Sequence, residues 1–318
     1  MKNELELSII IPSYNEEESL PELLAWIERS LAGKVQDYEV IFVDDGSSDR
    51  TWNVIKKLSQ NHPKSHGLRF NKNSGKSAAL RAGFAEAKGA VVVTMDADLQ
   101  DSPEEIPEMM RMIQEDGYDV ISGWKKKRYD PMSKTLPTKI FNWATRRMSG
   151  IDLHDFNCGL KAYSLPVVKA VDVRGEMHRY IPVLAKWSGY SKIGEKVVQH
   201  QERKYGSTKF GMERFMNGFL DLLTVSFVTR FGKSPMHLFG LFGTLMFFLG
   251  FGIFLALGGI KLYNMSQGDV SRNIADMSSF YIALTAMIIG TQFFLAGFIG
   301  ELITRHSTQE EYKISEKV

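Results

Sequence analysis

Three loops rich in carboxylate and amide side chains each follow a short apolar run. They are Pro12-Ser-Tyr-Asn-Glu16, Asp44-Asp-Gly-Ser-Ser-Asp49 and Asp96-Ala-Asp-Leu-Gln100. Asp96 and Asp98 stand two residues apart, so both carboxylates can turn toward one hard cation, with Gln100 as a third oxygen ligand. Mg²⁺ and Mn²⁺ prefer such ligands and share them with substrate phosphates. The pattern predicts a site for a hydroxyl-rich, phosphate-bearing ligand with a divalent cation.

Short apolar runs rich in β-branched residues must position these loops. The runs Leu7–Ile11, Val40–Val43 and Val91–Met95 have the composition of buried parallel strands. Helical patterns near 18–31, 51–59 and 76–87 lie between them, and another is predicted over 104–115, with Ser102 as N-cap before Pro103. The alternation predicts an α/β open sheet, whose ligands bind beyond the carboxyl ends of the strands. The polar loops should therefore share one edge.

Composition and spacing exclude several other classes of site. The balance of 39 basic and 37 acidic residues argues against nucleic acid as a partner. A single cysteine, Cys158, rules out an internal disulfide and a four-cysteine zinc site. Asn73-Ser-Gly-Lys-Ser77 contains the end of a P-loop, but the first glycine of that motif would fall at Phe70. No Gly-x-Gly-x-x-Gly follows a strand, which argues against a dinucleotide site.

Two long apolar stretches near the C-terminus predict a membrane anchor. His237 is the only ionisable residue from Met236 to Ile260, and Glu301 is the only one from Ser279 to Ile303. A helix of 25 residues measures roughly 37 Å, enough to cross a hydrocarbon core of about 30 Å. The N-terminus has no cationic segment before an apolar one, so no signal peptide is expected.

Basic residues cluster on the outer flanks of the two stretches and are scarce in the loop 261–278 between them. The positive-inside rule then places both termini in the cytoplasm and predicts a multi-pass protein of the cytoplasmic membrane. The expected organisation is a cytosolic catalytic domain over 1–208, an amphipathic interfacial helix over 209–233, a two-helix anchor over 234–305 and a cytosolic tail over 306–318. The membrane helices could also support a homo-oligomer.

Four motifs in order carry a family resemblance over the whole chain. They are Ile10-Ile-Pro-Ser-Tyr-Asn-Glu16, Val43-Asp-Asp-Gly-Ser-Ser-Asp-Arg-Thr51, Asn73-Ser-Gly-Lys-Ser-Ala-Ala-Leu-Arg-Ala-Gly83 and Asp96-Ala-Asp-Leu-Gln100. The chain resembles the family 2 glycosyltransferases of GT-A fold and, among these, the polyisoprenyl-phosphate glycosyltransferases, a group that includes bactoprenol glucosyltransferases and dolichol-phosphate mannose synthases. The Gln-x-x-Arg-Trp motif of the processive synthases is absent, since the nearest segment reads Gln201-Glu-Arg-Lys-Tyr205.

The resemblance implies a role for each candidate residue. On the donor side, Pro12, Tyr14, Glu16 and Asp44 would hold the nucleoside, and Asp96 and Ala97 would also bind the donor. Asp96, Asp98 and Gln100 would hold the diphosphate together with Mg²⁺ or Mn²⁺. Asp155 lies where relatives place a residue near the sugar, and with Asp98 it forms the predicted catalytic pair. Because a polyprenyl phosphate is already ionised at neutral pH, Asp155 is expected to orient a substrate rather than to remove a proton.

The acceptor phosphate also needs positive charge nearby. The resemblance assigns this role to Lys125, Arg203 and Lys209, whereas attraction to lipid headgroups is the alternative role for these cations. The implied reaction is an inverting, metal-dependent transfer of glucose from UDP-glucose to polyprenyl phosphate. Other UDP sugars and GDP-mannose remain alternatives, as does a non-catalytic scaffold that binds nucleotide sugars. The intact set of Asp96, Asp98 and Gln100 favours an enzyme.

Overall fold

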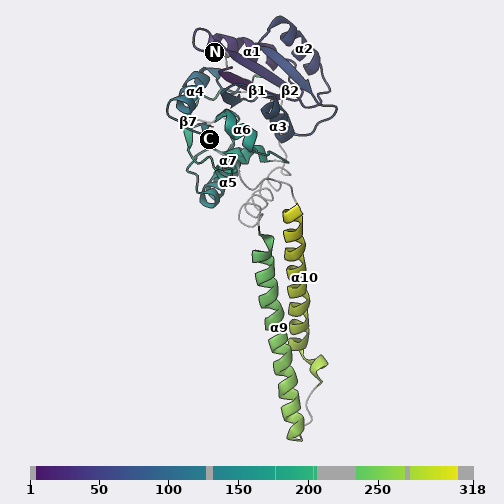
Figure 1. Cartoon of the computed structure of the whole chain (residues 1–318). Coiled ribbons are helices and arrows are strands. Elements are labelled where there is room, and N and C mark those ends of the chain that lie inside the picture. The colour runs from purple at the N-terminus through teal and green to yellow at the C-terminus, as the bar shows by residue number, and fades with distance from the viewer. Residues whose placement is uncertain are drawn as a thin grey trace. The chain divides into compact units, whose positions relative to one another are not determined.

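The computed structural model describes residues 5–126, 132–175, 177–202, 204–205, 234–268 and 273–306, with side chains left out at 132–140 and 304–306. The chain divides into two compact units, Met1–Leu223 and Thr224–Val318. The first holds the sheet and, after the role that the sequence predicts for it, is called here the catalytic unit (Figure 1). The predicted helix over 209–233 and the tail from residue 307 onward lie outside the described residues.

The first half of the catalytic unit alternates strand and helix as predicted. Its elements are β1 (Leu7–Ser13), α1 (Ser19–Leu31), β2 (Tyr38–Asp44), α2 (Thr51–Asn61), β3 (Ser65–Arg69), α3 (Lys76–Glu86) and β4 (Val91–Thr94). The three predicted helices are confirmed to within two residues at each end. Strand β3 was not predicted, because its sequence Ser-His-Gly-Leu-Arg lacks an apolar run.

The second half is less regular. It comprises η1 (Pro103–Glu105), α4 (Ile106–Gln114), β5 (Val120–Trp124), α5 (Met132–Ser149), β6 (Lys161–Ser164), α6 (Leu165–Ala170), η2 (Met177–Tyr180), α7 (Ile181–Trp187) and β7 (Ile193–Val197). The predicted cap is confirmed, since the Glu104 N–H donates to Ser102 Oγ at 3.3 Å and Pro103 opens the first turn. The helix predicted over 104–115 divides into η1 and α4.

The strands form one mixed sheet in the order β3-β2-β1-β4-β6-β5-β7. All neighbouring pairs are parallel except those made by β6, which runs antiparallel to both β4 and β5. In this register Lys161 pairs with Thr94, so β6 begins at the edge where β4 ends. The loop that precedes β6 therefore reaches the same edge as the loops that follow the parallel strands.

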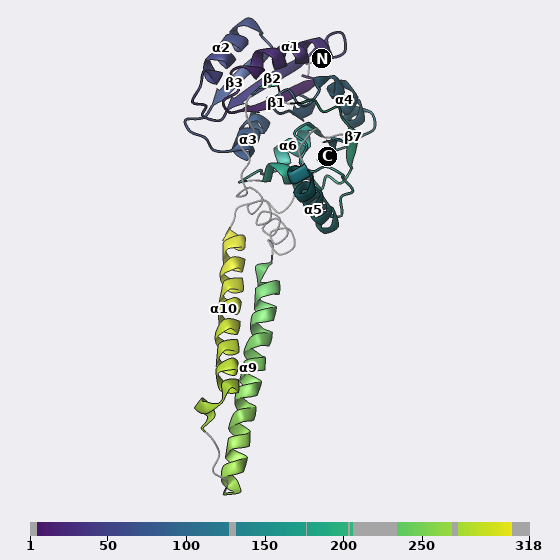
Figure 2. The ribbon, with the colours of Figure 1, turned by 180° about the vertical axis from the view of Figure 1, so that it is seen from behind.

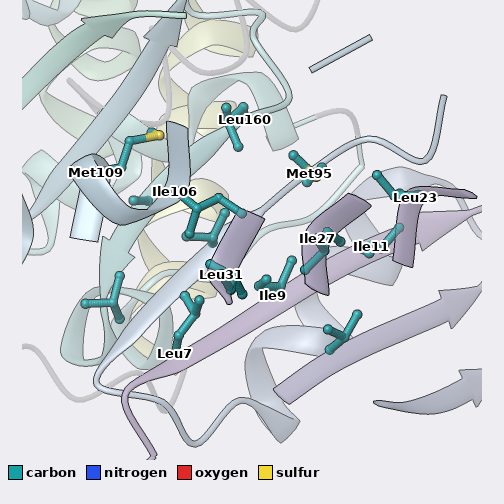
Figure 3. Packing of buried hydrophobic residues seen from close by; sticks show 14 of the residues in the cluster. Leu7, Ile9, Ile11, Leu23, Ile27, Leu31, Met95, Ile106, Met109 and Leu160 are labelled. Carbon is teal, nitrogen blue, oxygen red and sulfur yellow. The ribbon is translucent and has the colours of Figure 1, made fainter. Parts of the chain in front are cut away.

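Helices cover both faces of the sheet. Figure 3 shows Leu7, Ile9 and Ile11 of β1 packed toward Leu23 and Ile27 of α1. The intervening Ile10 belongs to a second cluster with side chains from α3, α6 and α7. Figure 2 shows α1 and α2 on one side of the strands and α3 on the other. Because alternate residues of β1 are buried on opposite faces, this strand reads as a continuous apolar run.

The second unit contains two apolar helices that run side by side, α9 (Pro235–Ser266) and α10 (Ser278–His306), with η3 (Ile274–Asp276) before α10 (Figures 1 and 2). Their mean hydropathies over an 18-residue window are 2.2 and 2.0, and both are long enough to cross a membrane. Glycines allow the close approach, since a Cβ at Gly243 would lie 2.6 Å from Gly290 O. The two predicted membrane spans are thus present as helices.

Candidate active site

The loops after β1 and β2 are joined by hydrogen bonds. The Asn15 N–H donates to Ser47 Oγ at 3.0 Å, and the Ser48 N–H donates to Asn15 Oδ1 at 2.9 Å. The Glu16 N–H donates to Thr51 Oγ1 at 2.8 Å. Asn15 adopts a positive φ of 56°, a conformation that asparagine tolerates better than most residues. These contacts bring the first two predicted donor loops together.

The candidate nucleoside residues differ in exposure. Pro12 lies within β1 opposite Val43, and the Tyr14 side chain that follows the strand is 40% exposed. Asp44 ends β2 and is fully buried, where its Oδ1 accepts the Ser47 N–H at 3.0 Å. The Tyr14 side chain is thus partly exposed at the end of β1, and Asp44 stands beneath the same loops.

Asp45 connects the second loop to the loop before α3. Its two carboxylate oxygens accept the N–H groups of Ser74 at 2.7 Å and Gly75 at 2.9 Å. In a P-loop, the corresponding N–H groups would hold a phosphate. Here a carboxylate of the chain takes that position, in agreement with the sequence argument against a P-loop. Lys76, which opens α3, turns instead toward Asp96.

Asp96 and Asp98 follow β4 at the same edge. The Lys76 ammonium contacts Asp96 Oδ1. Burial would raise the pKa of the Asp96 carboxyl, but Lys76 outweighs it and holds this pKa well below its usual range. Asp98 is buried, and its Oδ1 accepts the Gln100 N–H at 3.2 Å, across Leu99 with a φ of 60°. The Asp96 carboxylate therefore stays ionised near neutral pH.

The chemistry of this set fits Mg²⁺ or Mn²⁺. Among the described residues, no cluster of three or more His, Cys, Asp and Glu side chains is arranged around a metal position. Asp96, Asp98 and Gln100 supply two carboxylates and one amide, and such a cation typically takes its other ligands from water and substrate phosphates. The ammonium of Lys76 shows that a cation is accommodated at Asp96. The coordination shell of a metal held in this way would be complete only with the donor bound.

The loop before β6 packs directly onto residues 96–100, which carry the predicted metal ligands and are called here the metal loop. A Cβ at Gly159 would lie 2.5 Å from Asp96 Cγ, so only glycine fits there. Thr94 Oγ1 donates to Gly159 O at 3.0 Å. Asp155, four residues earlier, is buried, and its Oδ1 accepts the Asn157 N–H at 3.0 Å. The structure thus brings the predicted catalytic loop beside Asp96.

Lys161 holds this loop from below. Its ammonium is buried, donates to Phe156 O at 3.1 Å and also contacts Cys158 O. Burial lowers the pKa of the Lys161 ammonium, partly offset by Cys158 and Asp155. These two hydrogen bonds fix the backbone between Asp155 and Gly159.

Lys125 is already paired within the catalytic unit. Its Nζ lies 2.6 Å from Asp101 Oδ1, and both side chains are largely buried. Burial would lower the pKa of the Lys125 ammonium, but the Asp101 carboxylate outweighs it and raises this pKa. An acceptor phosphate would therefore meet Lys125 as part of an ion pair. The other two predicted phosphate contacts, Arg203 and Lys209, lie outside the described residues.

A segment after β7, called here the crossing segment (residues 198–202, 204 and 205), runs from the metal loop to α1. The Gln201 N–H donates to Gln100 O at 2.8 Å, and Gln100 Nε2 donates to Gln201 O at 3.4 Å. Farther on, Lys204 Nζ lies 2.7 Å from Glu22 Oε1, and Tyr205 OH donates to Glu22 Oε2 at 3.1 Å. The chain is therefore held at Gln100 before Arg203 and at α1 after it.

Sequence reasoning gave no role to Asp45, Lys76 or Lys161. Asp45 and Lys76 belong to motifs that carry the family resemblance, and Lys76 follows a loop at the predicted ligand edge. Lys161 is a charged residue at the start of a short strand. A lysine inside an otherwise apolar or small-residue segment is the signal that could have identified it.

Comparisons with known proteins agree with this geometry. Residues 8–171 match the family described as Glycosyl transferase family 2. Dodecaprenyl-phosphate galacturonate synthase of Rhizobium johnstonii is 33% identical over 304 residues, 95% of this chain and 88% of the relative. Undecaprenyl-phosphate 4-deoxy-4-formamido-L-arabinose transferase of Pectobacterium carotovorum is 36% identical over 304 residues, 94% of this chain and 88% of the relative.

A solved structure shares the fold. Glucosyl-3-phosphoglycerate synthase of Mycobacterium tuberculosis, in complex with Mn²⁺ and uridine-diphosphate-glucose, aligns with a TM-score of 0.54 at 18% identity, over 70% of this chain and 78% of that one. It is a GT-A glycosyltransferase fold, as the sequence predicted for this chain. With its family match, its relatives and this sheet, the chain belongs to glycosyltransferase family 2 and is a glycosyltransferase enzyme.

Proposed function

We propose that the protein transfers a sugar from a nucleotide-sugar donor to polyprenyl phosphate at the cytoplasmic face of the membrane. The observation that carries this proposal is the gathering at one sheet edge of Asp44, Asp96 and Asp98 with the loop of Asp155. Relatives that cover almost the whole chain are named for sugar transfer to dodecaprenyl and undecaprenyl phosphate. The two apolar helices would keep the enzyme at the membrane that holds such an acceptor.

The arrangement supports an inverting displacement. The acceptor phosphate is an anionic nucleophile, so its attack on the anomeric carbon needs positive charge and orientation more than a base. A divalent cation held by Asp96, Asp98 and Gln100 would offset the charge of the leaving nucleoside diphosphate. Lys76 adds a fixed positive charge beside Asp96, and Asp155 orients the sugar or the acceptor from the adjoining loop.

Glucose carried by UDP is the donor proposed from the sequence. The names of the relatives point to galacturonate and 4-deoxy-4-formamido-L-arabinose as further sugars to compare, and GDP-mannose tests the other nucleotide. The deciding experiment incubates the full chain in membranes with undecaprenyl phosphate and each radiolabelled donor. We expect a lipid-linked, acid-labile product from one UDP sugar. If the protein binds a nucleotide sugar but transfers no sugar from any donor, it would be the non-catalytic scaffold instead.

The metal assignment has its own test. Asp96→Asn and Asp98→Asn should each lower transfer about 100-fold or more, since a bound cation supplies several kcal/mol of charge stabilisation. EDTA should abolish transfer by the wild type until Mg²⁺ or Mn²⁺ is restored. Asp37→Asn, an exposed carboxylate before β2, is the matched control and should retain full activity. Undiminished turnover in EDTA would contradict the assignment.

A further inference from the structure

The last two turns of α5 direct a tryptophan away from the catalytic unit. Trp143 is 67% exposed and Met148 is 44% exposed. Arg147 is also exposed, and it shares the face of Trp143 because it follows by four residues. The opposite face of the helix is buried at Asn142 and Thr145. This helix is therefore anchored on one side and presents an aromatic ring and a cation on the other.

A second exposed tryptophan lies near the same end of α5. Lys186 Nζ donates to Ser149 O at 2.9 Å and to Gly150 O at 3.0 Å, which holds the end of α7 beside the end of α5. Trp187 follows Lys186 and is 38% exposed. The residues Trp143, Arg147, Met148 and Trp187 are called here the α5 surface.

The other three tryptophans have partners inside the catalytic unit. Trp26 Nε1 donates to Glu104 at 3.4 Å, and the Arg69 guanidinium lies 5.8 Å from the centre of the Trp52 ring. Trp124 stacks on His154 with ring centres 4.1 Å apart. Trp143 differs from these in exposing most of its surface, and an exposed ring of this size marks a contact surface.

Charge indicates which partner fits. The sequence of α5 contains four basic residues and no acidic one. Arg146 donates to Leu153 O and lies 3.5 Å from Asp152, so Arg147 is the outward cation among the described side chains of this helix. Tryptophan prefers the level of lipid headgroups, and arginine near it is attracted to anionic lipids. The same chain carries two helices that fit a membrane, which brings a lipid surface within reach.

We propose that the α5 surface docks on anionic lipid headgroups, as a membrane contact separate from α9 and α10. The contact is linked to the site, because Asn142 Nδ2 donates to His154 O at 2.8 Å and the Phe156 N–H donates to Asn142 Oδ1 at 3.3 Å. The buried side of α5 thus holds the loop that carries Asp155, while its exposed side rests on the bilayer. Docking would set this loop at headgroup level.

The distribution of tryptophan gives a direct optical test. All five tryptophans precede α9, so the membrane helices contribute no tryptophan emission. The full chain is placed in nanodiscs of phosphatidylcholine and phosphatidylglycerol, with or without bromine on the acyl chains, because bromine quenches only tryptophan close to it. We expect quenching in wild type, clearly less of it in Trp143→Phe, and the loss of most of it when Trp143 and Trp187 are both replaced by Phe. Trp26→Phe is the matched control and should be quenched like wild type.

Two further measurements separate the possible occupants of this surface. In a variant that retains Trp143 alone, the emission should be quenched directly, and Arg147→Gln or added salt should reduce the quenching in discs rich in phosphatidylglycerol. Unquenched emission in that variant would overturn the proposal and would mean that residues 206–233 or a second copy cover Trp143. Equal quenching of wild type and Trp143→Phe would overturn it as well.

Discussion

Lys161 places a buried amino group under the loop between Asp155 and Gly159. It satisfies the carbonyl of Phe156 and contacts that of Cys158, two backbone groups that water cannot reach easily in this position. Its effect on the reaction is therefore expected to be indirect. It sets where Asp155 stands and how closely Gly159 approaches Asp96.

Replacing this lysine should damage both the fold and the turnover. Lys161→Met leaves two buried carbonyls without their donor, at a cost of about 1–3 kcal/mol each in unfolding free energy. We expect a lower kcat with nearly unchanged donor affinity, measured by transfer and by nucleotide titration. Lys169→Met is the matched control, because Lys169 also donates to two carbonyls, Phe84 O and Ala85 O, on the exposed side of α6. Equal loss of kcat in both variants would contradict a positioning role.

The residues of the site could be predicted only as far as they are close in sequence. Asp96, Asp98 and Gln100 form one short motif, and the strand before them is an apolar run, so their common edge followed from the pattern. The contact of Lys76 with Asp96 joins residues 20 apart, and that of Gln100 with Gln201 joins residues 101 apart. Such pairs depend on how the sheet is ordered, which local periodicity does not determine.

Among the strands too, the sequence predicted those that a local pattern marks and missed those that depend on distant neighbours. Strands β1, β2 and β4 are apolar enough to be recognised alone. Strand β7 reads Ile-Gly-Glu-Lys-Val and β6 reads Lys-Ala-Tyr-Ser, and both owe their extended conformation to the neighbours with which they pair. The antiparallel direction of β6 could not be predicted from its four residues. The three apolar runs pair in parallel as predicted, and the sheet is mixed only because of β6.

The crossing segment should matter for the acceptor more than for the donor. Its contacts with Gln100 precede Arg203, a predicted phosphate ligand, and its contacts with Glu22 follow it. Glu22→Gln should raise the acceptor KM roughly twofold to fivefold and leave the donor KM unchanged, since exposed ion pairs contribute modestly. Glu108→Gln, which removes an exposed ion pair with Arg111 on α4, serves as the control. A change in the donor KM alone would argue against this role.

Close packing of α9 and α10 depends on particular glycines. A Cβ at Gly243 would lie 2.6 Å from backbone atoms of α10, whereas one at Gly252 meets nothing within 4 Å. Gly243→Val should therefore weaken the packing by about 1–3 kcal/mol, and Gly252→Val should be nearly neutral. Unfolding in mixed micelles with increasing dodecyl sulfate measures both variants. Similar unfolding midpoints for the two variants would show that the contact at Gly243 contributes little to the packing of the helices.

For the molecule as a whole, the single cysteine reports on the integrity of the catalytic unit. Cys158 is 2% exposed, and burial raises the pKa of its thiol to about 12. Because the thiolate is the reactive form, the folded protein should resist maleimide at pH 8 and react fully in denaturant. The rate of labelling then measures opening of the loop beside Asp96. Rapid labelling of the native protein would contradict the packing described here, and Cys158→Ser provides the blank.

The crossing segment also fixes an order of events during synthesis. The described hydrogen bonds of the catalytic unit extend to Tyr205, and the first apolar helix begins at Pro235. A ribosome adding about 5–20 residues per second therefore completes the segment that closes the metal loop before it begins the first membrane helix. The sheet, including the late strands β6 and β7, is fully translated before the insertion machinery receives an apolar segment. A nascent chain halted after α9 would already contain every described residue of the site.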